Sequence, residues 1–590
     1  MKWHRAQSLA RDSGISRYVV AVVRQIWLLV GVLSVACAAR PPAREAARGG
    51  SQAERWDALS ERYLERSFAH DPGFAALQGR HERDGQIVDL SSPAIASWAA
   101  ELARFRAEAQ QLEGGLDPER GFEREALLAN VDAALFWSER VQEHRRSPLV
   151  YTNALDPMVY LTRAYAPLAQ RMSAFSKHAR AMPQVVAAMK KNLVLPLPRS
   201  FVEVGVQILA GLVPYLQRDV PAIFASVDDR AAQSELRAAI AVGVAAVEDG
   251  KSWLEAQRAH ANESFALGPS LFRELLWATE RIDTPLAELK AAGQSDLARN
   301  LAALRERCAQ LLPGGSLAQC AALIMEDKPA AGPLVTAREQ VAMLRDFVVE
   351  HELASIPGSE EAHVEEAPPF KRWNQAFIEI PGPYERNLPA VYYIAPPDPS
   401  WSAAEREAYV PGRFDLMFIS VHEVWPGHFL QFLHANRAPR PFARVFVGYA
   451  FAEGWAHYTE ELVWEAGLSG GDVRAHVGQL LNALLRNVRF LSALGLHTEG
   501  MSITESERMF QEHALTDPAN ARQQAARGTF DPAYLNYTLG KLVIRKLRSD
   551  WLAAHPGGSL RDFHDRFLSF GGPPLPLVRK AMLGRADGAL

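Results

Sequence analysis

His422, Glu423 and His428 are the residues whose types and spacing first indicate chemistry. They lie in the segment Phe414–His434, which reads FDLMFISVHEVWPGHFLQFLH. Zinc enzymes commonly take two histidine ligands from one helix and place a glutamate beside the first histidine. Neutral imidazoles are suitable zinc ligands, and the glutamate is the general base that accepts a proton from water. The segment therefore predicts a zinc site with a built-in base.

The spacing of the two histidines departs from the usual HExxH pattern, because His428 follows His422 by six positions. On a helix of about 3.6 residues per turn, positions six apart point about 120° away from each other. Pro426 removes a backbone donor, and Gly427 accepts unusual dihedral angles. We expect a bulge there that brings His428 back over His422. The alternative is that these are surface histidines, or histidines satisfied inside the core.

A second segment, Phe451–Leu462 (FAEGWAHYTEEL), offers a third ligand. Glu453 is the candidate, because a carboxylate one helix downstream is the usual third ligand in zinc peptidases of the His-Glu type. His457 lies one turn further on the same face. It either orients a ligand through a hydrogen bond or packs in the core. Glu460 and Glu461 are predicted to be the solvated end of this helix.

Together, HEVWPGHFLQ and AEGWAHY resemble the motifs HExxPGHxxQ and EGWAxY of a bacterial family catalogued as a domain of unknown function. That family resembles zinc metallopeptidases of the gluzincin type, whose helical members include oligopeptidases and carboxypeptidases. The resemblance covers about residues 52–585. It implies zinc held by His422, His428 and Glu453, with Glu423 as the catalytic base.

The resemblance is strongest over about residues 385–550 and extends to the segment Leu494–Met501, LGLHTEGM, which is similar to the family pattern DTGLHxxGW. It implies that His497 is a hydrogen-bond donor to the substrate carbonyl. The sequence departs from the pattern at Ala493, where the family has Asp, and at Met501, where it has Trp. At these two positions, this chain therefore lacks the family residues that would support the side chain of His497.

A further segment, Tyr534–Arg548 (YLNYTLGKLVIRKLR), is similar to the family pattern YxxGKxxIxxLR, and Tyr537 is the matching tyrosine. A phenol near zinc can stabilise the oxyanion of a tetrahedral intermediate. The alternative is that Tyr537 packs against Gly540 on a helix. Arg545 and Arg548 either bind the C-terminal carboxylate of a peptide or solvate a helix face.

The elements that must position these residues are mainly helices. From about 53 to 332, apolar residues recur at three- and four-residue spacing among good helix formers. An acidic, proline-rich stretch, 355–371, precedes Ala390–Ala395 (AVYYIA), which is the best strand candidate. Helices return from Ala403 to the C-terminus.

This order predicts a mainly α fold with two helical halves around a deep zinc cleft and a small β element before the HExxPGH helix. We divide the chain into an N-terminal helical region, 53–355, and a catalytic metallopeptidase-like region, 356–590. In zinc peptidases, an edge strand before the zinc helix pairs with the extended substrate. Tyr392 and Tyr393 alternate in direction, so at most one of them can line the cleft.

The N-terminus predicts export. Residues 1–36 combine basic residues with a short apolar run that is typical of a signal peptide, although an N-terminal anchor helix is the alternative. Leu33–Cys37 (LSVAC) resembles a bacterial lipobox, which makes Cys37 a lipid-attachment candidate, and the same residues also fit an ordinary cleavage site. Residues 37–52 are predicted to be a flexible tether. We expect a periplasmic, lipid-anchored or secreted protein.

Composition and charge limit the classes of protein to which this chain can belong. The chain of 590 residues has 48% hydrophobic residues and a formal charge of −4, which suits a globular protein and does not indicate a nucleic-acid partner. Three cysteines are too few for a disulfide scaffold. Cys308 and Cys320 either form one disulfide or remain buried thiols.

The expected function is zinc-dependent hydrolysis of peptides. One alternative is a zinc amidase or esterase with a non-peptide envelope substrate. The other is a non-catalytic helical envelope lipoprotein with a structural metal site. Glu423 argues against this last alternative, because a structural zinc needs no base.

Overall fold

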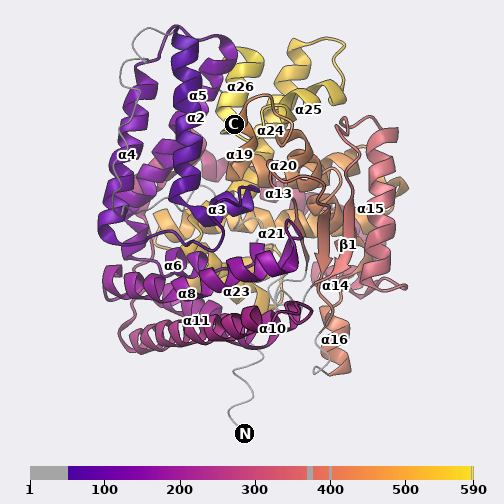
Figure 1. Ribbon diagram of the computed structural model, residues 1–590. Helices are drawn as coiled ribbons and strands as arrows, with labels where there is room; N and C mark the ends of the chain where they lie inside the picture. The colour runs from indigo at the N-terminus through magenta and orange to yellow at the C-terminus, as the bar shows by residue number, and fades with distance from the viewer. Residues whose placement is uncertain (1–50, 368–375, 398–401, 587, 589) are drawn as a thin grey trace.

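The computed structural model describes residues 51–367, 376–397, 402–586, 588 and 590 (Figure 1). The predicted signal peptide, Cys37 and nearly all of the predicted tether lie outside these residues. The chain is 71% helix and 3% strand, which confirms the predicted mainly α fold with a small sheet.

The first group of helices contains α2 (Gln52–His70), α4 (Ser92–Gln110) and α5 (Pro118–Leu135). Ser51 begins α2 with a capping box: its hydroxyl accepts the backbone N–H of Glu54, whose carboxylate accepts the N–H of Ser51. Each helix buries one apolar face against the others, as helical periodicity requires. In Figure 1 the indigo helix α5 lies beside the yellow C-terminal helix α26 (Leu575–Leu583), which it contacts.

The second group contains α8 (Leu168–Asn192), α9 (Arg199–Pro214) and α11 (Arg230–Gln257), which share a separate core. Within the described residues, Arg199–Ile223 is the single helical stretch long and apolar enough to cross a membrane by length and composition. Because one side of α9 is buried against α11, core packing accounts equally well for its apolar character.

The largest core joins helices that precede the sheet to helices that follow it. The preceding helices are α12 (Gly268–Glu280), α13 (Leu286–Leu311), α14 (Leu317–Glu326) and α15 (Pro333–Glu350). The helices that follow and share this core are α17 (Arg413–Glu423), α18 (His428–Ala435), α20 (Tyr449–Glu465), α21 (Val473–Thr498), α22 (Ile503–His513), α23 (Pro518–Phe530), α24 (Asn536–Ala554) and α25 (Leu560–Leu568). Two further helices follow the sheet: α16 (Ala403–Tyr409), and α19 (Pro441–Val445), which packs with the first group of helices.

Short elements complete the described chain. They are α3 (Pro72–Leu77), η3 (Phe136–Val141), η4 (Glu143–Arg145), α6 (Leu149–Ala154), α7 (Val159–Thr162), η5 (Tyr215–Asp219), α10 (Val220–Ile223), η6 (Arg258–His260), η8 (Leu468–Gly471) and η9 (Pro532–Leu535). Cys308 of α13 and Cys320 of α14 form a disulfide, which decides between the two states expected from the sequence.

The sheet has three described strands, β1 (Ala362–Glu366), β2 (Ala376–Glu379) and β3 (Ala390–Ile394), in the order β1-β3-β2. The strand candidate is therefore confirmed, but β3 pairs with β1 on one side and β2 on the other. It cannot be the edge strand expected to pair with a substrate. The buried Tyr392 instead turns its hydroxyl toward Ser420 of α17, at 3.4 Å, and so packs the sheet on that helix.

Candidate metal centre

The first two predicted ligands lie on either side of a helix interruption. His422 is in the last turn of α17, and α18 begins with His428. Between them lies a cis peptide bond before Pro426, and the N–H of Gly427 donates to the carbonyl of Val421 at 3.0 Å. A Cβ at position 427 would collide with the carbonyl of His422, so this turn requires glycine. The expected bulge is thus a full interruption of the helix.

This interruption turns His428 back toward His422. The centroids of the two imidazole rings are 4.8 Å apart, and the ring planes are nearly perpendicular at 89°. The indole Nε1 of Trp455, on α20, donates a hydrogen bond to the carbonyl of Pro426 at 2.8 Å. The turn is therefore fastened to α20, the helix that carries the third candidate ligand.

Glu453 of α20 faces both histidines. Its Oε2 lies 3.3 Å from Nε2 of His422, and its Oε1 lies 3.6 Å from Nε2 of His428. One ligand atom from each of the three residues lies within 4.8 Å of the others. All three side chains are buried. The structure thus brings the three sequence-predicted ligands together from three helices.

The donor set fits a zinc ion. Two imidazoles and one carboxylate are a common ligand set of catalytic zinc, which keeps a further position for water or substrate. Neither ring nitrogen of His428 has a hydrogen-bond partner among the described residues, and neither does Oε2 of the adjacent Glu423. Buried polar groups normally have partners, so these orphaned atoms point to a missing group at this place.

Electrostatics favour an added positive charge. Burial lowers the pKa of His428 to about 4, so its ring is neutral, as a ligand must be. Burial also opposes protonation of His422, but hydrogen bonds with Glu453 and Glu460 outweigh it and raise the pKa of His422 to about 9. The carboxylates thus stabilise a cation here. Burial raises the pKa of Glu423 to about 7.

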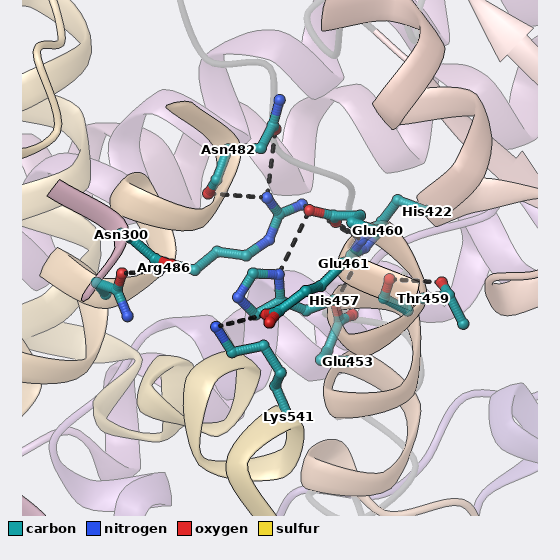
Figure 2. Close-up of polar contacts among 12 residues, drawn as sticks. Asn300, His422, Glu453, His457, Thr459, Glu460, Glu461, Asn482, Arg486 and Lys541 are labelled. Atoms are coloured by element: carbon teal, nitrogen blue, oxygen red, sulfur yellow. Dashed lines mark hydrogen bonds and ion pairs between the residues drawn. The ribbon is translucent and has the colours of Figure 1, made fainter. Parts of the chain in front are cut away.

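Glu460 is not at the solvated end of α20, contrary to the sequence prediction. It is completely buried, and its Oε1 accepts a hydrogen bond from Nδ1 of His422 at 2.7 Å. Arg486 of α21 approaches the same oxygen at 2.9 Å, and Figure 2 shows its guanidinium reaching Glu460. His457 contacts the other carboxylate oxygen at 3.3 Å. His457 therefore supports Glu460 and does not contact the ligands itself.

Glu461 is also buried rather than solvated. It pairs with Arg299 of α13 at 2.8 Å and with Arg545 of α24 at 3.0 Å. Nζ of the fully buried Lys541 lies 3.7 Å from Oε2 of Glu461 (Figure 2), and it also lies 2.6 Å from Oδ2 of Asp296. The local sequence cannot show that Glu461 is buried, because its cationic partners come from two helices that are far from it in the chain.

The two arginines considered for carboxylate binding already have partners. Arg545 pairs with Glu461, as above, and Arg548 lies 2.8 Å from Glu465 and 3.1 Å from the hydroxyl of Tyr458. Both therefore join α24 to α20. This arrangement favours the structural alternative that the sequence left open.

Tyr537 lies against the candidate ligands. Its ring stacks near that of His422, with the centroids 6.3 Å apart. The position follows from a close crossing of α20 and α24, where a Cβ on Gly540 would lie 2.6 Å from the Cα of Gly454. Glu453 directly precedes Gly454, and Tyr537 precedes Gly540 by about one helical turn. The crossing thereby brings both side chains to one place.

His497 does not face the candidate ligands. Its Nε2 donates to the carbonyl of Gly528 at 2.7 Å, and its Nδ1 accepts the backbone N–H of Leu267 at 3.3 Å. Its ring packs near Phe265 and Phe272. Because both nitrogens are used by backbone groups, the structure gives His497 a structural role instead of the expected contact with a substrate carbonyl.

Comparison with known proteins identifies the family. Residues 72–582 match the family model described as bacterial protein of unknown function, DUF885. The chain belongs to this family. No curated protein matches it significantly.

Two solved structures of similar fold carry comparable descriptions. A candidate lipoprotein of unknown function from Shewanella oneidensis has a TM-score of 0.75 and 20% identity, over 90% of this chain and 99% of its own. A candidate lipoprotein from Colwellia psychrerythraea has a TM-score of 0.76 and 17% identity, over 91% of this chain and 99% of its own. At these identities, the similarity of this DUF885 chain to the two proteins establishes the fold alone.

Proposed function

We propose that this protein hydrolyses peptide bonds in short peptides, with one zinc ion held by His422, His428 and Glu453. The observation that carries the proposal is the convergence of three buried ligand atoms within 4.8 Å of one another. The acid Glu423 directly follows His422 in the chain, and its Oε2 has no hydrogen-bond partner among the described residues. A zinc ion in such a site lowers the pKa of a water molecule and polarises a carbonyl oxygen.

Glu423 is the general base in this proposal. It accepts a proton from the attacking water and returns it to the nitrogen of the leaving amine. Burial of its carboxyl group raises its pKa to about 7, which suits a group that must accept and release a proton near neutral pH.

Tyr537 is the proposed donor to the oxyanion. Its phenol makes no hydrogen bond with any described residue, and its ring lies beside His422. A hydroxyl group there can donate a hydrogen bond to the negative oxygen that develops on the substrate carbonyl. The described sheet has two edge strands, β1 and β2, and β2 contacts α17, so β2 is our candidate to pair with an extended substrate.

We also propose that the protein is exported and held at the cell envelope by a lipid on Cys37. The described Cys308–Cys320 disulfide supports an oxidising compartment. The two proteins of similar fold are themselves described as candidate lipoproteins.

The test combines metal analysis with cleavage of a mixed peptide pool. Purified protein should contain about one zinc per chain and cleave peptides, and a chelator should abolish cleavage until zinc is restored. Mass spectrometry of the products identifies the bonds cleaved. Zinc without peptide cleavage would contradict the proposal and leave a non-peptide substrate or a structural metal.

A further inference from the structure

Arg489 is a buried arginine with no carboxylate partner in the described chain. It lies on α21, one turn beyond Arg486, and only 3% of its surface is exposed. Its Nε donates to Oε1 of Gln524 at 2.9 Å. Its two Nη groups, which carry four N–H donors, form no hydrogen bond or ion pair with any residue that the structure describes.

The neighbouring arginines differ from Arg489 in this respect. Arg486 pairs with Glu460 at 2.9 Å, and Arg527 pairs with Asp531 at 2.8 Å. These carboxylates therefore balance the other two cations and leave Arg489 without a carboxylate partner among the described residues. Burial lowers the pKa of Arg489 to about 10, which still leaves the guanidinium charged at neutral pH. An unpaired buried charge is costly, so its retention calls for an anion that arrives from outside.

The position of Arg489 links this cation to the candidate metal centre. Its guanidinium carbon lies 4.9 Å from the centroid of the Tyr537 ring, which in turn lies 6.3 Å from that of His422. Placed end to end, these two distances equal the length of about three extended residues. A group bound by Arg489 therefore belongs to the part of a substrate nearest the reacting bond.

We propose that Arg489 binds a carboxylate of the peptide substrate, located within about three residues of the bond that is cleaved. The inference rests on the proposed peptidase function and names the substrate class. A guanidinium offers paired N–H donors that match the two oxygens of a carboxylate. The C-terminal carboxylate of a short peptide and the side chain of Asp or Glu share this chemistry, and the substrates below distinguish them.

The first test measures kcat/KM on matched peptides. One series has free C-terminal carboxylates and neutral side chains, a second has the same sequences as C-terminal amides, and a third consists of amides with one Glu in place of Gln. We expect the wild type to prefer one carboxylate-bearing series by about 10- to 100-fold, as for a charge-assisted hydrogen bond. Preference for the first series identifies the C-terminus, and preference for the third identifies an acidic side chain.

The variant Arg489→Gln should remove this preference, because the amide side chain carries no charge, and Arg489→Lys should restore part of it. The matched control is Arg548→Gln, because Arg548 already pairs with Glu465. This control should keep the wild-type ratio. If the substitution only destabilised the protein, kcat/KM would fall equally for all three peptide series. The ratio of kcat/KM between series therefore separates carboxylate binding from a structural effect.

Binding is measured in parallel by calorimetry on zinc-loaded protein. The probes are N-acetyl-Ala-Ala, its C-terminal amide and N-acetyl-Ala-Glu amide. Wild type should bind one of the two carboxylate probes at least tenfold more tightly than the neutral amide, and Arg489→Gln should not. This difference in binding would support the role of Arg489 even if no peptide is cleaved. In that case only the proposed peptidase function would be wrong. Equal ratios for wild type and Arg489→Gln in both assays would overturn the role of Arg489.

Discussion

Nδ1 of His422 lies 2.7 Å from Oε1 of Glu460, and both side chains are buried. A carboxylate in this position accepts the Nδ1 proton and so fixes the tautomer in which Nε2 has its lone pair free. That lone pair faces Glu453, at 3.3 Å. Such contacts orient metal-binding histidines and increase their basicity. We therefore expect Glu460 to control how well His422 can serve as a metal ligand.

Replacement Glu460→Gln should weaken zinc binding about 10- to 100-fold, because the amide still accepts the Nδ1 proton but has no charge. Competition with a chromophoric chelator measures the affinity. The adjacent Glu461→Gln is a matched control, since Glu461 pairs with Arg299 and Arg545 and does not contact His422. Equal affinities for the two variants would contradict the orienting role of Glu460.

Replacement Glu423→Gln should lower kcat by about 10²- to 10⁴-fold, the usual contribution of a general base. Zinc content should remain that of the wild type, because Glu423 is not among the three converging ligands. Metal analysis and turnover on the same preparation check both parts. Glu465→Gln, on the exposed end of α20, should keep full activity. A fully active Glu423→Gln enzyme would remove Glu423 as the base.

Replacement Gly540→Ala should destabilise the fold by about 1–3 kcal/mol, as expected when a methyl group is forced into close packing. The new Cβ would collide with the carbonyl of Ala450 and approach Gly454 to 2.6 Å. Turnover should fall as well, because α24 carries Tyr537. Gly211→Ala is the control: its Cβ would meet no atom within 4 Å, so it should be neutral or stabilising. Chemical denaturation measures both, and equal stabilities would contradict the close crossing.

The buried side chain of His564 should make the folded protein less stable at acidic pH. It is fully buried, with Nδ1 donating to the carbonyl of Leu353 at 2.5 Å and Nε2 accepting from Tyr458 at 2.7 Å. Burial lowers its pKa to about 4, whereas the unfolded chain has a value near 6.5. The unfolded state therefore binds more protons in this window. The stabilisation is present above about pH 6.5 and is lost as the pH falls toward 4.

Between pH 7 and pH 5, this residue should account for about 2 kcal/mol of lost unfolding free energy. Urea unfolding at the two pH values should show a smaller loss for His564→Gln than for wild type. His260→Gln, which changes an exposed histidine, should match the wild-type loss. An unchanged pH dependence in His564→Gln would show that the pKa of His564 is the same in the folded and unfolded states.

The sequence predicted the parts of the site that local pattern determines. His422, Glu423, His428 and Glu453 stand in short motifs whose residue types are those of a zinc site, and helical periodicity gave the mainly α fold. The turn at Gly427 was expected from Pro-Gly chemistry, although its extent was greater than a bulge. Tyr537 was found only through resemblance.

The remaining features of the site depend on pairing between residues that are far apart in the chain, which a local sequence pattern cannot predict. The sequence predicts that Glu460 lies at the solvated end of its helix, yet Glu460 is buried and its partner Arg486 lies on another helix. One signal could have revealed it, since Glu460 falls two turns after Glu453 and so on the same helical face. Arg489 could not be found in this way, because its significance is the absence of a partner in the described structure.

The glycine crossing of α20 and α24 also bears on how this protein could diversify. Because Gly454 and Gly540 meet backbone to backbone, the separation of Glu453 and Tyr537 does not depend on the size of any intervening side chain. The surrounding residues are then free to vary in shape and charge without shifting the reactive groups. If the proposed function holds, new substrate preferences would then arise by point mutation while Glu453 and Tyr537 keep their relative positions.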